Sequence, residues 1–98
     1  MILVRDVFQL QFGRAKEALD LWKDGVKFAE KERYGPIRIM TDLTGPFYTL
    51  VLESTHQTLA EYEAALKRMS GSKEWGEWYR KFIPLVKSGW REIFTVVQ

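Results

Sequence analysis

The first dozen residues alternate between apolar and other positions. From Ile2 to Phe12 the even positions are mostly apolar, whereas the odd positions include an arginine and two glutamines. A period of two is typical of a strand with one buried face. The even face should therefore meet the helices, and it carries one acid, Asp6. Gly13 is expected to end this strand.

The spacing of apolar residues then changes to that of helices. Apolar positions recur every three or four residues from about Arg14 to Tyr34, which predicts a long amphipathic helix that Gly35-Pro36 ends. Thr58 and Glu61 have the spacing of a capping box and predict the start of a second helix. The buried stripe of that helix is expected to comprise Leu59, Tyr62, Leu66 and Met69.

Four further segments complete the pattern. Ile37–Leu43 and Phe47–Glu53 are β-rich and predict a hairpin through the turn residues between them. Lys73–Phe82 predicts another helix, which Pro84 ends or kinks. Trp90–Val97 alternates as a last strand. The order strand-helix-strand thus occurs twice within 98 residues.

This order predicts a single α+β domain over residues 1–98 with a ferredoxin-like split βαβ fold, in which a four-stranded antiparallel sheet carries the helices on one face. The third strand is expected to be apolar on both sides. One side would hold Phe47, Thr49 and Val51, and the other Tyr48, Leu50 and Leu52. A sheet with one face in water should alternate more cleanly. We therefore expect a homodimer in which the sheet faces away from the helices pack together.

Composition and charge exclude several classes of partner. Fifteen Lys and Arg against thirteen Asp and Glu give a net charge of +2, and the two signs are interleaved, so nucleic acid is not an expected partner. No apolar run is long enough to span a bilayer. The apolar start, Met1–Val4, is too short for a secretory signal, and we expect a cytoplasmic protein. The absence of cysteine excludes disulfides and thiolate metal sites.

The single histidine does not indicate a metal or nucleophilic site. His56 follows Ser54 and Thr55 in a polar segment, where we expect it to be an exposed turn residue. One histidine supplies too few ligands for a metal. No serine lies in a nucleophile-elbow motif, and the glycines form no phosphate loop. The sequence therefore predicts neither a metal nor a cofactor.

Aromatic residues form the densest unusual feature of the chain. The set comprises Tyr62, Trp75, Trp78, Tyr79, Phe82 and Trp90. Large rings at helical spacing are consistent with a packed core, and alternatively with a site for a flat apolar ligand between helices and sheet. Asp6 also allows two interpretations, because burying a carboxylate on an apolar strand face is costly unless the group is paired or has a function. It would form an ion pair with Arg91 or Arg38, or would serve in acid-base chemistry.

Several of these motifs together resemble the dimeric α+β barrel superfamily, and within it the NIPSNAP-like group. The resemblance rests on Gly13-Arg14 after the first strand, on Leu50–Ser54 leading into Leu59–Tyr62, and on Trp75–Val86 before the last strand. It covers nearly the whole chain. It implies that two sheets pair face to face into a barrel, which would cover the apolar second face of the third strand.

The superfamily includes cofactor-independent quinol-type monooxygenases and haem-degrading monooxygenases, so the resemblance also implies a pocket between the sheet and helices of each subunit. In the haem-degrading branch this pocket carries an Asn, a Trp and a His, whose places correspond here to Asp6, Tyr62 and Tyr79. All three residues differ, and the sequence contains no Asn. We expect no haem degradation by that route.

Three functions remain open at this point. The first is a binding protein for a small apolar or aromatic molecule, with Tyr62, Trp75 and Trp78 as ligand-binding residues. The second is a cofactor-independent monooxygenase or isomerase, with Asp6 and Tyr79 as catalytic residues. The third is an interaction module whose interior is filled. An enzyme predicts that Asp6 reaches a cavity, whereas the interaction module predicts that the aromatic rings leave none.

Overall fold

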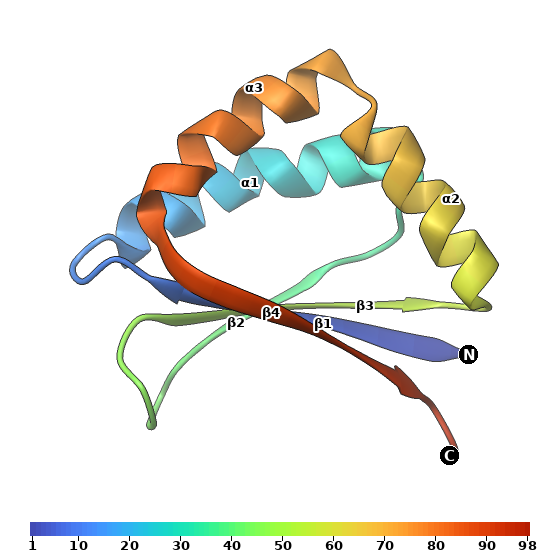
Figure 1. Cartoon of the computed structure of the whole chain (residues 1–98), viewed down its shortest axis with the longest axis horizontal. Coiled ribbons are helices and arrows are strands. Elements are labelled where there is room, and N and C mark those ends of the chain that lie inside the picture. The colour runs from blue at the N-terminus through green and yellow to red at the C-terminus, as the bar shows by residue number, and fades with distance from the viewer.

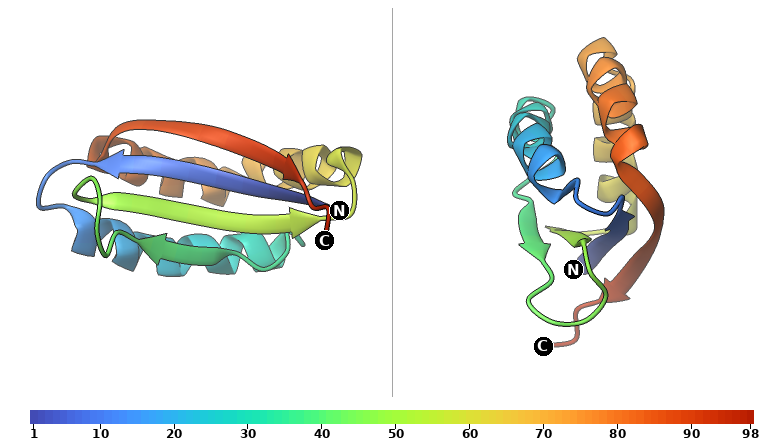
Figure 2. Two further views of the ribbon diagram at one scale, coloured as in Figure 1. Left: turned by 90° about the horizontal axis from the view of Figure 1, so that it is seen from below. Right: turned by 90° about the vertical axis from the view of Figure 1, so that its left-hand side faces the viewer.

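The computed structural model describes residues 1–98 and contains every strand and helix that the pattern predicts (Figure 1). The elements are β1 (Ile2–Leu10), α1 (Ala15–Lys31), β2 (Arg38–Thr41), β3 (Thr49–His56), α2 (Leu59–Ser70), α3 (Lys73–Phe82), a 3₁₀ turn η1 (Ile83–Leu85) and β4 (Val86–Thr95). All three helices lie on one side of the sheet, and Figure 2 shows that the other face is bare. The predicted α+β fold is confirmed.

The sheet is antiparallel throughout, with strand order β2-β3-β1-β4. The first strand of the chain is therefore central, and the two strands beside it come from the middle and the end of the sequence. This register sets Asp6 of β1 opposite Leu52 of β3 and Arg91 of β4. Directly opposed residues point to the same face of a sheet. The even face of β1 thus meets the helices, as its alternation predicts.

Capping side chains fix where the last two helices begin. The hydroxyl of Thr58 accepts a hydrogen bond from the backbone N–H of Glu61 at 3.1 Å, as the capping-box spacing predicts. The hydroxyl of Ser72 accepts one from the N–H of Trp75 at 3.4 Å. From this cap α3 runs back across α1, and its side chains Trp75 and Trp78 lie over the sheet.

The buried residues form two hydrophobic cores. The first comprises Leu10, Ala18, Trp22, Leu50, Leu52, Trp78, Phe82 and Leu85. The second comprises Val4, Ala29, Tyr34, Tyr62, Ala65 and Met69. The first core fills one end of the space between the helices and the sheet, beneath α1 and α3. The second core fills the other end, near α2 (Figure 1). A cavity lined by residues of both cores lies where they meet.

The predicted start of β3 is wrong, because the chain turns immediately before this strand. Tyr48 has a φ of +61°, so the chain turns there and β3 begins at Thr49 instead of Phe47. The outer face of β3 then carries Thr49, Val51, Glu53 and Thr55, which alternate with an inner face. The prediction that this strand is apolar on both sides is therefore wrong.

The prediction that His56 is an exposed turn residue is also wrong. β3 continues to His56, three residues beyond its predicted end, and pairs this residue with Ile2. His56 is only 9% exposed. It shares the helix-facing side of β3 with Ser54, which is 6% exposed. Two polar residues assigned to a loop thus lie inside the protein.

Smaller differences concern helix and strand ends. α1 stops at Lys31, three residues before the predicted Tyr34, because Arg33 adopts a φ of +55°. In α2 the buried residue between Tyr62 and Met69 is Ala65, whereas the predicted Leu59 is half exposed. β4 begins four residues before Trp90, the predicted start, at Val86.

The bare face of the sheet mixes charge with exposed rings. The row Arg38, Glu53, Arg5 and Glu92 crosses all four strands with alternating sign. Its ion pairs are Arg5–Glu53 at 2.9 Å, Arg5–Glu92 at 3.7 Å and Arg38–Glu53 at 3.9 Å. Trp90 and Phe94 project from the same face and are 51% and 46% exposed. None of the three helices has the length and the apolar composition of a membrane span.

We predict opposite effects of alanine at the two helical glycines. A Cβ at Gly25 of α1 would come within 2.8 Å of the rings of both Trp22 and Trp78, so Gly25→Ala should destabilise the fold by about 1–3 kcal/mol. A Cβ at Gly76 of α3 meets no atom within 4 Å, so Gly76→Ala should stabilise it by about 0.5–1 kcal/mol. Urea unfolding at one protein concentration measures both. Equal effects would contradict the close contact of α1 with α3.

Candidate functional site

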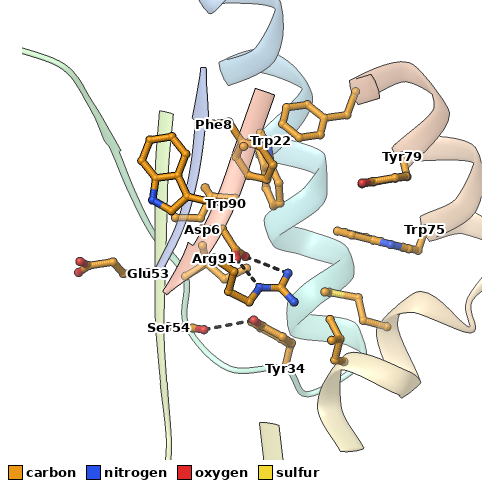
Figure 3. A pocket seen from close by; sticks show the side chains of 16 residues that line it. Asp6, Phe8, Trp22, Tyr34, Glu53, Ser54, Trp75, Tyr79, Trp90 and Arg91 are labelled. Atoms are coloured by element: carbon orange, nitrogen blue, oxygen red, sulfur yellow. Dashed lines mark hydrogen bonds and ion pairs between the residues drawn. The ribbon is translucent and has the colours of Figure 1, made fainter. Parts of the chain in front are cut away.

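A cavity of about 300 Å³ lies between the sheet and the helices, where the two cores meet. Sixteen residues line it, and eleven of them are hydrophobic. The apolar wall is built mainly from Phe8, Trp22, Ile37, Leu52, Leu66, Met69, Trp75 and Phe82. Its polar lining consists of Asp6, Tyr34, Ser54, Tyr79 and Arg91, with Glu53 at its edge (Figure 3). The volume is at the lower end of the range for small-molecule sites.

One polar feature of the cavity is an ion pair between Asp6 and Arg91. Nε of Arg91 donates to Oδ1 of Asp6 at 2.5 Å, and Nη2 donates to Oδ2 at 3.4 Å. The ion pair is bidentate because the two residues lie opposite each other on adjacent strands. The carboxylate is mostly buried, whereas the arginine side chain is 44% exposed. The ion-pair interpretation of Asp6 is therefore confirmed, with Arg91 as its partner.

Arg91 also faces Tyr62. The centre of its guanidinium lies 5.8 Å from the Tyr62 ring, within the range of a cation-π contact. Burial lowers the pKa of Arg91, but the hydrogen bond and the charge of Asp6 outweigh this effect and leave the pKa above its ordinary value. The guanidinium is thus a permanent cation held by a carboxylate on one side and a ring on the other.

The second polar feature is a hydrogen-bonded group of Tyr34, Ser54 and His56. Oγ of Ser54 donates to the hydroxyl of Tyr34 at 3.2 Å (Figure 3) and lies 3.0 Å from Nε2 of His56. Tyr34 follows the end of α1, so the left-handed turn at Arg33 is what directs its ring back over the sheet. Tyr34 and Ser54 line the cavity, while His56 lies behind them.

Burial favours the neutral forms of Tyr34, Tyr62 and His56. It raises the pKa of Tyr34 to about 12, although the hydrogen bond with Ser54 opposes the effect. It also raises the pKa of Tyr62 above the ordinary value. Burial lowers the pKa of His56 below its ordinary 6.5, with the nearby charge of Glu61 acting in the opposite direction. At pH 7 the phenols are protonated and the imidazole is uncharged.

Three of the five predicted site residues line the cavity. Asp6 lies at its base, and Trp75 and Tyr79 face it from α3 (Figure 3). Trp75 stacks on Tyr79 with ring centroids 6.1 Å apart, which gives one side of the cavity a flat aromatic wall.

The other two predicted residues, Tyr62 and Trp78, are buried beside the cavity without lining it. Nε1 of Trp78 donates to the carbonyl of Leu21 at 2.7 Å, which locks this indole between α3 and α1. Trp90, part of the predicted aromatic set, points to the opposite side of the sheet, as does Glu53 (Figure 3). The aromatic residues therefore divide into a core group, a cavity wall and an outer-face group.

Sequence reasoning missed Tyr34, Ser54 and His56. A signal for two of them was present, because Leu50, Leu52, Ser54 and His56 continue the period of two if the strand is extended through the polar segment. The polar composition of residues 54–57 concealed it. No comparable signal marks Tyr34, whose position depends on the turn after α1. No group of three or more His, Cys, Asp or Glu side chains converges in a way that could hold a metal.

Comparison with known proteins identifies the fold. No protein-family model matches the sequence, and no curated protein matches it. Among solved structures, an uncharacterised NIPSNAP domain protein from Burkholderia xenovorans has a TM-score of 0.90 at 15% identity, over 99% of this chain and 95% of that chain. A NIPSNAP family protein of unknown function from Agrobacterium tumefaciens has a TM-score of 0.89 at 17% identity, over 96% and 86%.

A third similar structure is described as an antibiotic biosynthesis monooxygenase. Its TM-score is 0.78 at 14% identity, and the alignment covers 100% of both chains. Identities this low relate the structures through their fold and not through their chemistry. The chain therefore has the ferredoxin-like α+β fold of NIPSNAP-family proteins and antibiotic biosynthesis monooxygenases, as the resemblance in its sequence predicted.

Proposed function

We propose that this protein binds a small, flat, mostly apolar or aromatic molecule in the cavity between its sheet and its helices. The observation that carries the proposal is the cavity itself, which is walled by aromatic rings and holds a few polar groups. A filled interior would have favoured the interaction module. Protein interiors are close-packed, and a space of about 300 Å³ beside six aromatic side chains is unusual for a core that serves only stability.

The charges of the lining favour an uncharged ligand. Asp6 and Arg91 neutralise each other, and the hydroxyls of Tyr34 and Ser54 carry no charge at pH 7. A ligand with a net charge would have to displace one partner of the ion pair, which is costly in a partly buried site. A ring system with one hydrogen-bonding oxygen would satisfy the lining without disturbing it.

The proposal includes a homodimer formed through the bare faces of two sheets. Trp90 and Phe94 expose about half of their surface on this face, one on either side of the charged row, and Val7 and Val51 stand in the same row as Trp90. Covering these side chains would remove large apolar surface from water. A stable contact of this kind should bury more than about 2,000 Å² in total.

A cofactor-independent monooxygenase or isomerase that uses Asp6 and Tyr79 is the second candidate. Its support is the fold shared with an antibiotic biosynthesis monooxygenase and the position of both residues on the cavity. Binding is favoured because both carboxylate oxygens of Asp6 are engaged by Arg91, which leaves the carboxylate poorly placed as a base.

Oxygen uptake tests this second candidate. With 1,4-dihydroxynaphthalene, which can itself reduce oxygen, an enzyme should consume oxygen faster than buffer does and should lose this activity in Asp6→Asn. We expect a rate equal to that of buffer for the wild type. Turnover that disappears in Asp6→Asn would replace binding with catalysis as the function.

We predict that Val51→Lys will separate the dimer. Val51 lies on the outer face of β3 next to Val7, where a lysine would place a charge inside the contact. Light scattering of the wild type at micromolar concentration should give the mass of two chains, and the variant that of one. Leu59→Lys is the matched control, because Leu59 is half exposed on the helical side. A monomeric wild type would refute the dimer.

We predict that Trp75→Ala will weaken the binding of 2-naphthol by about 2- to 12-fold, the loss expected for one aromatic contact. Trp75 is part of the flat wall formed with Tyr79. Isothermal titration calorimetry measures the affinity without relying on tryptophan fluorescence. Phe12→Ala is the control, since it removes an aromatic ring that is 77% exposed and outside the cavity. Absence of 2-naphthol binding to the wild type would contradict the proposed function.

A further inference from the structure

A second hollow of about 360 Å³ lies on the far side of Tyr34 from the ligand cavity. It is open and polar, and its lining includes Arg33, His56, Glu61 and Arg68. Tyr34 borders both spaces, whereas Ser54 borders only the cavity and His56 only the hollow. The hydrogen-bonded group Tyr34, Ser54 and His56 therefore connects a mostly apolar cavity with a more polar hollow.

Two hydrogen-bond directions satisfy this group, and the one in which Ser54 donates to Tyr34 leads from the hollow toward the cavity. Ser54 has one hydroxyl hydrogen and gives it to the Tyr34 oxygen at 3.2 Å. Oγ of Ser54 must then accept from Nε2 of His56 at 3.0 Å, so the neutral imidazole carries its hydrogen on Nε2. The hydroxyl hydrogen of Tyr34 is then available to an acceptor outside this group, either the neighbouring hydroxyl of Tyr62 or an atom in the cavity. Every donor thus points from the hollow toward the cavity.

We propose that His56, Ser54 and Tyr34 form a proton relay that connects a ligand in the cavity with the polar hollow. A proton from water binds Nδ1 of His56, the Nε2 hydrogen moves to Ser54, the hydrogen of Ser54 moves to Tyr34, and the hydrogen of Tyr34 moves to an acceptor atom on the ligand. Each oxygen gains one hydrogen and loses one, and the positive charge that enters at Nδ1 of His56 leaves the chain on the ligand, so no oxidant or reductant is required. The imidazole ends neutral, with its hydrogen on Nδ1.

The surroundings of His56 suit this role. The titratable and charged groups that face it come from three elements: Tyr34 and Arg33 after α1, Glu61, Tyr62 and Arg68 of α2, and the chain start at Met1 beside β1. The rings of Tyr34 and Tyr62 each lie 5.1 Å from the imidazole and hold its plane. A histidine fixed between two rings keeps Nε2 aimed at Ser54, which a relay requires.

The first test needs no ligand. His56 is the only histidine, so nitrogen NMR of the labelled imidazole reports this residue alone. We expect the Nε2-protonated tautomer in the neutral form. A dominant Nδ1-protonated tautomer would reverse the chain of donors and overturn the proposal. This outcome is independent of whether any ligand binds.

The second test rests on the proposed function and uses 2-naphthol, with naphthalene as a probe that lacks the oxygen. Saturation with 2-naphthol should raise the pKa of His56 by about 0.3 unit, a twofold change in proton affinity, because the chain of hydrogen bonds strengthens cooperatively. Naphthalene should leave this pKa unchanged. If calorimetry shows that 2-naphthol binds and the pKa of His56 does not move, the relay is refuted although the binding function stands.

Variants separate a relay from a structural role. Tyr34→Phe keeps the ring and removes only the hydroxyl, and Ser54→Ala breaks the chain at its centre. Either variant should abolish the response of His56 to 2-naphthol. Thr55→Val is the matched control, since Thr55 lies between Ser54 and His56 on the opposite face of β3, and it should keep the response. A response that survives in Tyr34→Phe would overturn the proposal.

Discussion

The close contact of α1 with α3 is the constraint on which the rest of the structure depends. Gly25 lacks a side chain at the point where the rings of Trp22 and Trp78 meet, so the two helices can press together there. This contact holds α3 close to the sheet, and the indole rings of Trp22 and Trp78 fill one end of the space between helices and sheet. Since α2 turns away from α3 (Figure 1), the other end cannot be filled in the same way, and the cavity is the space left between.

The parts of the fold that follow local rules could be predicted from the sequence. The alternation of β1 put Asp6 on the helix-facing side, and the capping box at Thr58 located the start of α2. The parts that failed depend on backbone turns in the left-handed region at Arg33 and Tyr48, residues that rarely adopt it. The turn at Arg33 ends α1 early and places Tyr34, whereas the turn at Tyr48 delays the start of β3.

The candidate site shows the same division. Asp6, Trp75 and Tyr79 were found because each lies on a regular element with a clear periodicity. Tyr34, Ser54 and His56 were not, because their burial results from tertiary pairing at the end of β3, against the polar composition of that segment. The site has two polar features, the Asp6–Arg91 ion pair and the group of Tyr34, Ser54 and His56. Because the second was not predicted, the sequence alone could not separate binding from catalysis.

The charged row on the bare sheet face has a consequence for how the strands find their alignment. Arg38, Glu53, Arg5 and Glu92 each stand opposite a residue of the other sign. A slip of any strand by one residue would turn its charge toward the apolar side beneath the helices, and a slip by two would leave the charge without its counterpart. The row therefore favours a single strand register in the folded sheet.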